Sequence, residues 1–94
     1  MTNTDRFTSV WDAIEDTPEE AANMKVRSQL MMQLKSHITN SGLSQADAAK
    51  VLGITQPRVS DLMRGKINLF AIDALVNMAD KAGLHVELQL LDAA

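Results

Sequence analysis

The segment 43–66, LSQADAAKVLGITQPRVSDLMRGK, constrains the fold more than any other part of the chain. Ser44 can accept hydrogen bonds from the free N–H groups at a helix start, and residues 45–52 then run without Gly or Pro. Gly53 can supply the left-handed residue that ends such a helix. The sequence therefore predicts a short helix over 45–52.

The same signals recur directly after this helix. Thr55 is a second N-cap residue, Pro57 falls in a first turn, where its missing N–H is not needed, and Gly65 stands at a C-cap position. These residues predict a second short helix over 56–64, joined to the first by a tight turn.

Small and apolar residues indicate how the two helices pack. Two helices that cross steeply over a short turn need small side chains at the crossing, so we expect Ala49 and Val59 to touch. On the second helix, Val59, Leu62 and Met63 form one apolar stripe. The residues expected to pack the motif are Ala49, Gly53, Val59 and Leu62, and those expected to face away are Gln56, Pro57, Ser60, Asp61 and Arg64, with Arg58 at the edge.

One helix is predicted on each side of this pair. The run Thr17-Pro18-Glu19-Glu20 combines an N-cap Thr, Pro at the first helical position and a Glu that can complete a capping box. This helix can continue to about Ser41. Apolar residues at helical spacing predict another helix over 70–82, which Gly83 ends.

Residues 84–90, LHVELQL, alternate apolar and polar side chains. Period two favours a half-buried strand, although Leu84, Leu88 and Leu91 are also spaced as in a helix. No other segment offers a partner strand, and an unpaired strand leaves backbone groups unsatisfied. We therefore expect pairing with the same strand of a second copy across a two-fold axis. The expected dimer contacts are Leu84, Val86, Leu88 and Leu90.

The N-terminal segment is polar at first and then patterned. Phe7, Val10, Trp11 and Ile14 fall at i, i+3, i+4 and i+7, which predicts a short amphipathic helix. One interpretation packs this helix on its own domain or on a dimer mate. The other makes it an acidic, apolar arm for a protein partner.

The 43–66 segment resembles the helix-turn-helix of the lambda-repressor-like (Cro and Xre) family of DNA-binding proteins. Gln45 matches the glutamine at the start of the family's first motif helix, and Gln56 matches the one that opens its recognition helix. The wider span from Thr8 to about Leu90 is similar to small HigA-like antitoxins encoded beside a RelE-type toxin. The resemblance implies that this chain reads DNA, without saying which sequence.

The expected fold is therefore mostly α. We predict a lambda-repressor-like helix-turn-helix bundle of about five helices, with one C-terminal strand pairing across a homodimer. The expected parts are an N-terminal tail and short helix (1–17), a DNA-binding domain (18–83, with its motif at 44–66) and a C-terminal dimerisation strand and tail (84–94).

Charge is segregated along the chain, which carries a net charge of −3 over 94 residues. Residues 1–23 sum to −5, residues 24–66 to +5 and residues 67–94 to −3. One cationic face is what contact with phosphates requires, whereas chance clustering on a solvated surface is the alternative.

A symmetric dimer would present two recognition helices to successive major grooves about 34 Å apart, so the target should be an inverted repeat. Gln56 suits adenine and Arg58 suits guanine, while Asp61 could accept from cytosine or hold Arg58 or Arg64. The predicted base contacts are Gln56, Pro57, Arg58, Ser60 and Asp61, and the predicted phosphate contacts are Gln45, Thr55, Arg64, Lys66 and Lys35.

Other chemistry finds little support in the residues. The chain has no Cys, its two His lie on different elements outside metal-ligand spacing, and no glycine-rich phosphate loop is present. We expect no catalytic residues, metal or cofactor. We also expect a cytoplasmic protein, because no export signal or long apolar run stands out.

The resemblance implies a transcriptional repressor that neutralises a RelE-like or HigB-like toxin as an antitoxin and represses its own operon. Two alternatives stay open. The chain could be a stand-alone Xre-type phage or metabolic regulator, or chiefly a protein-binding inhibitor.

Overall fold

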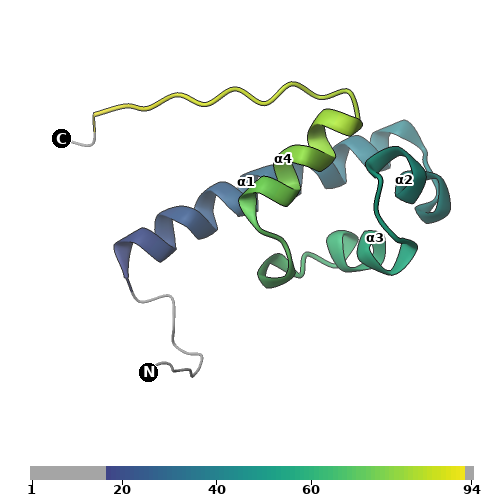
Figure 1. The fold of residues 1–94 in the computed structure, drawn as a ribbon, viewed down its shortest axis with the longest axis horizontal. Coiled ribbons are helices and arrows are strands. Elements are labelled where there is room, and N and C mark those ends of the chain that lie inside the picture. The colour runs from purple at the N-terminus through teal and green to yellow at the C-terminus, as the bar shows by residue number, and fades with distance from the viewer. Residues whose placement is uncertain (1–16, 93–94) are drawn as a thin grey trace.

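The computed structural model describes residues 17–92, which form four α-helices and one short 3-10 helix. The elements are α1 (Pro18–Ser41), α2 (Gln45–Leu52), α3 (Gln56–Met63), η2 (Ile67–Leu69) and α4 (Ile72–Lys81). The long α1 packs against α4, and the α2–α3 pair lies beside them with η2 following α3 (Figure 1). No helix within residues 17–92 is long and apolar enough to cross a membrane.

The first three α-helices start at the caps that the sequence predicts. Thr17 Oγ1 accepts from the Glu20 N–H at 3.1 Å, Ser44 Oγ accepts from the Asp47 N–H at 3.1 Å, and Thr55 Oγ1 accepts from the Arg58 N–H at 3.3 Å. Each bond satisfies an N–H group that the first turn of a helix leaves without a partner. These helix starts are confirmed.

The core lies where α1, the α2–α3 pair and α4 meet. It is centred on the C-terminal half of α1, whereas Ala21 and Ala22 near the start of that helix are exposed. The buried residues are Met31, Leu34 and Ile38 of α1, Ala48 and Leu52 of α2, Val59 and Leu62 of α3, Phe70, and Leu75, Met78 and Ala79 of α4.

The helix predicted over 70–82 begins two residues later than expected. Residues 67–69 form η2, and Phe70 then has an extended backbone, with φ −130° and ψ 118°. Phe70 is 1% exposed. Its apolar side chain is therefore buried as expected, but the chain reaches the core in an extended conformation before α4 starts.

The expected strand over 84–90 is absent, because residues 84–92 form no regular secondary structure. A strand is defined by hydrogen bonds to a neighbouring strand, and none lies beside this segment within residues 17–92. The helical alternative does not form either. Figure 1 shows the segment leaving α4 as an extended stretch. The predicted helix at Phe7–Ile14, the fifth of the expected bundle, falls outside the described residues.

Candidate nucleic-acid interface

The α2–α3 motif is held by side chains that are almost completely buried. Ala48 and Leu52 of α2 and Val59 and Leu62 of α3 are each at most 1% exposed. Ala49 is half-buried against the same core. Between the helices, Gly53 has φ 71°, and the Ile54 N–H donates to the Ala49 carbonyl at 3.1 Å. The orientation of α3 is therefore fixed by close packing.

The start of α3 faces outward. Gln56 and Pro57 are exposed, as is the capping residue Thr55. No hydrogen bond to the Gln56 side chain is found within the described part of the chain. Further along the helix, Ser60 and Asp61 are half-buried and Arg64 is exposed. Gln56 is thus the polar side chain that the first turn of α3 presents to solvent.

Arg58 lies in the same turn but packs on the protein. Its Nη1 donates to the Leu69 carbonyl at 2.9 Å, and its guanidinium lies 4.1 Å from the centre of the Phe70 ring. A base contact by Arg58 would require these interactions to be released. The base-contact role of Arg58 stays a prediction, and the contacts with the Leu69 carbonyl and the Phe70 ring compete with it.

Asp61 pairs with Lys66, which the sequence predicts as a phosphate contact and not as a partner of Asp61. Its Oδ1 lies 3.4 Å from Lys66 Nζ, and its carbonyl accepts from the Lys66 N–H at 3.1 Å. Gly65, with φ 74°, turns the chain back and brings Lys66 over the end of α3. The expected partners, Arg58 and Arg64, are not paired with Asp61 in the structure of residues 17–92.

Two cations of α1 approach the end of this motif. A Cβ placed on Gly65 would lie 3.8 Å from Lys35 Nζ, so the Lys35 ammonium sits beside the end of α3. Arg27 donates from Nη1 to the Ile67 carbonyl at 3.3 Å, and its Nε donates to Asn23 Oδ1 at 2.7 Å. Lys35 therefore lies close to the motif, which is consistent with its predicted phosphate contact. The role of Arg27 was not visible in the sequence.

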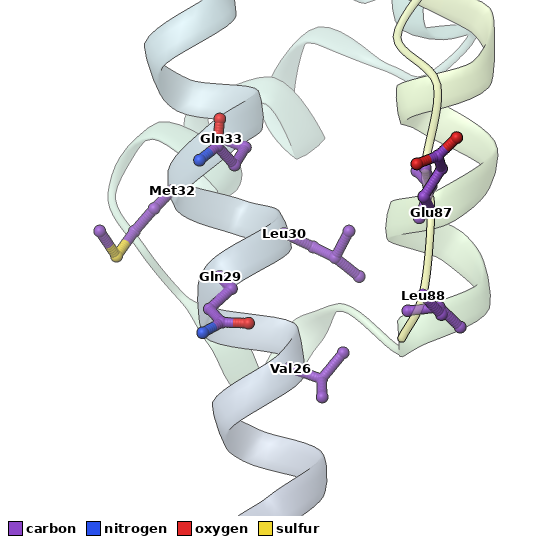
Figure 2. Close-up of a pocket in the computed structure, with 8 residues that line it drawn as sticks. Val26, Gln29, Leu30, Met32, Gln33, Glu87 and Leu88 are labelled. Atoms are coloured by element: carbon purple, nitrogen blue, oxygen red, sulfur yellow. The ribbon is translucent and has the colours of Figure 1, made fainter. Parts of the chain in front are cut away.

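The predicted dimer contacts divide into two groups. Leu84 and Val86 are half-buried against the core, whereas Leu88 is 82% exposed and Leu90 is 98% exposed. A cavity of about 330 Å³ lies between this segment and α1. Figure 2 shows Val26 and Leu30 of α1 pointing toward the segment, and Met32 pointing away from it. The α1 wall of this groove combines the apolar Val26 and Leu30 with the amides of Gln29 and Gln33.

Comparisons with known proteins agree on one kind of fold. The family model described as a helix-turn-helix domain matches residues 13–90. A solved structure assigned by name to the XRE family of transcriptional regulators is 32% identical to this chain, with a TM-score of 0.72. The match covers 78% of this chain and 82% of that one. The comparison with curated proteins found no match.

Proposed function

Because the chain belongs to the helix-turn-helix domain family, and is thereby a DNA-binding regulator of transcription, we propose that it is a homodimeric repressor of an inverted-repeat operator. In this proposal α3 enters the major groove and its first turn meets base edges.

The observation that carries the proposal is the exposed amide of Gln56 at the start of a rigidly packed helix. A glutamine amide can donate and accept at the same time, which matches the N6 and N7 atoms of adenine. Pro57, Ser60 and Asp61 extend the proposed base-contacting surface along α3. The proposed phosphate contacts are Gln45, Thr55, Arg64, Lys66 and Lys35, which would set the register of α3 on the duplex.

A homodimer is proposed because the C-terminal segment is extended and its last leucines are exposed. Leu88, Leu90 and Leu91 are each at least 77% exposed, and three such neighbours are costly to leave in water. Pairing with the same segment of a second copy would satisfy its backbone and cover these side chains. The groove beside Val26 and Leu30 then offers an apolar surface for the second copy.

The regulator is further proposed to be an antitoxin that neutralises a RelE-like or HigB-like toxin. Support comes from the resemblance of its sequence to HigA-like antitoxins and from the charge of −5 over residues 1–23, which suits a basic partner. The alternatives are a stand-alone XRE-type regulator without a toxin and a protein whose main activity is inhibition of a partner.

Footprinting on the DNA upstream of the chain's own gene tests the operator proposal. We expect one protected inverted repeat whose half-site centres lie about 10 base pairs apart, or a multiple of that spacing. Absence of protection there and on genomic DNA at large would contradict it. Coexpression with the product of an adjacent gene tests the toxin proposal, because an antitoxin should form a complex with a small basic protein and relieve its toxicity.

A further inference from the structure

The side chains of Arg58, Arg27 and Asp61 all contact the turn that follows α3, residues 65–69. We propose that Arg58 is a positioning residue that holds residues 66–69 against the DNA backbone, instead of reading a base itself. This inference rests on the proposed operator binding, and it assigns Arg58 a different part in that binding.

The contacts of Arg58 tie the end of the turn to α3. Its Nη1 donates to the Leu69 carbonyl at 2.9 Å, and its guanidinium lies 4.1 Å from the centre of the Phe70 ring. Phe70 is 1% exposed, so the ring is a fixed surface. A guanidinium over an aromatic face gains a cation–π interaction in addition to its hydrogen bond. Arg58 therefore has a defined resting place in the free protein.

The beginning of the turn is fixed by two other side chains. Arg27 of α1 donates to the Ile67 carbonyl at 3.3 Å, and Asp61 of α3 pairs with Lys66 at 3.4 Å. The turn is thus held at Lys66, Ile67 and Leu69 by side chains from α1 and α3. Such a short segment would otherwise lose this single conformation, because 3-10 turns have weak internal hydrogen bonds.

The held turn presents groups that suit a phosphate. Among residues 65–70, the backbone N–H of every residue except Asn68 donates to a backbone oxygen of the described chain. Asn68 is exposed, and the Lys66 side chain beside it is 48% exposed. Backbone N–H groups and lysines are common phosphate contacts, and they carry no sequence information. Figure 1 places η2 directly beyond α3, on the same edge of the molecule.

The two roles of Arg58 predict different patterns of binding. A base reader loses discrimination at one base pair when it is removed, while a residue that positions a phosphate contact weakens binding to all sequences alike. A positioning role also depends on Phe70, which a base-reading role does not need.

The test compares Arg58→Met, Phe70→Leu and the double variant in the full-length protein, with Gln56→Ala as the base-reading control. Affinity is measured for the operator and for a panel of single-base variants at several salt concentrations. Amide exchange of Leu69 and Phe70 in the free protein reports the turn directly. Arg58→Met keeps a long apolar stem, and Phe70→Leu keeps an apolar side chain, so both should fold.

We expect Arg58→Met and Phe70→Leu each to weaken binding by about tenfold on every sequence of the panel. The double variant should bind DNA no more weakly than the single variant with the lower affinity, because both substitutions disturb the same Arg58–Phe70 contact. In both single variants the slope of log affinity against log salt should become less steep by about one. The backbone amides of residues 69 and 70 should exchange faster than in the wild type.

Loss of discrimination at one base pair in Arg58→Met, with Phe70→Leu unchanged, would assign base reading to Arg58 and overturn the inference. Unchanged affinity in both variants would also overturn it. Failure of the wild-type chain to bind any DNA would instead contradict the proposed function on which the inference rests.

Discussion

Gln56 and Arg58 stand two residues apart in the first turn of α3, and their side chains meet different surroundings. Gln56 is exposed, whereas Arg58 is half-buried and donates to the Leu69 carbonyl. Residue type alone suits both for base contact, because amides and guanidinium groups both make bidentate bonds to purines. What distinguishes them is the contact each already makes within its own chain.

Replacing Gln56 with Ala should remove recognition of one base pair without disturbing the fold. The side chain is exposed, so the unfolding free energy should change by less than about 0.5 kcal/mol. Discrimination at one operator position should fall by about 1 to 3 kcal/mol. Binding to single-base operator variants measures this effect. Gln45→Ala is the matched control, because the proposed phosphate contact of Gln45 should weaken binding to all sequences equally.

At the scale of elements, the helix starts could be predicted from the sequence because their causes are local. Thr17, Ser44 and Thr55 each cap a helix by accepting from an N–H three residues ahead. Gly42 and Gly53 end α1 and α2 in the left-handed conformation, with φ 69° and 71°. All these interactions span a few residues, so residue type and spacing suffice to indicate them.

The turn after α3 could not be predicted in the same way, because its supports are distant in sequence. Arg27 reaches the Ile67 carbonyl across 40 residues, and Arg58 reaches the Leu69 carbonyl across 11. Neither contact leaves a periodic pattern. The C-terminal segment forms no strand within residues 17–92, although its alternation of apolar and polar residues predicts one. The predicted partner is the same segment of a second copy, so the pairing stays a prediction.

Two glycines that end helices allow a comparison of backbone strain with crowding. Gly42→Ala and Gly53→Ala should each lower the unfolding free energy by about 1 to 2 kcal/mol, since both positions have positive φ. A Cβ at Gly42 meets nothing within 4 Å, but one at Gly53 would lie 2.6 Å from Lys81 Nζ. Lys81 is exposed and flexible, so it should move at small cost.

Chemical denaturation of both variants measures this difference, and Gly53→Ala combined with Lys81→Ala isolates the crowding. We expect Gly53→Ala to be slightly less stable than Gly42→Ala, and the double variant to recover that difference. A much larger loss in Gly53→Ala that Lys81→Ala fails to relieve would show that the turn itself tolerates no side chain.

At the scale of the whole molecule, charge and apolar surface lie in different places. Residues 24–66 sum to +5 and include the α2–α3 motif, whereas the exposed leucines lie in the C-terminal segment after α4. Figure 1 shows α3 and η2 at the opposite edge of the molecule from that segment. DNA contact and dimerisation can therefore use separate surfaces.

Operator affinity should fall steeply as salt rises, because Lys and Arg that contact phosphates release counterions. Lys35→Ala should make the slope of log affinity against log salt less steep by about 0.9, since the Lys35 ammonium lies beside the end of α3. Lys25→Ala is the matched control on the exposed, N-terminal half of α1. Binding isotherms at four or more salt concentrations check both variants. Equal slopes for wild type and Lys35→Ala would place Lys35 away from the phosphates.

The dimer proposal makes a geometric prediction about the C-terminal segment. In antiparallel pairing about a two-fold axis through a residue, side chains of the same face meet, so apolar residues oppose apolar ones. With Val86 on the axis, His85 would face Glu87 of the second copy and could donate a hydrogen bond to its carboxylate, whereas an axis at Glu87 would place two carboxylates opposite each other. Like charges directly opposite disfavour the second register.

Because the chain has no Cys, a single introduced thiol can form a disulfide only between copies. Val86→Cys should form disulfide-linked dimers under mild oxidation, since directly opposed Cβ atoms in an antiparallel pair approach the separation that a disulfide requires. Non-reducing electrophoresis and the mass in solution measure the yield. Asn40→Cys, exposed near the end of α1, is the control for random collision. Efficient linkage through Glu87→Cys instead would move the axis by one residue. Two results together would contradict the proposed dimer: a monomeric mass at high concentration, and disulfide yields for Val86→Cys and Glu87→Cys no greater than that of Asn40→Cys. The exposed Leu88 and Leu90 would then have to be covered by something other than a second copy.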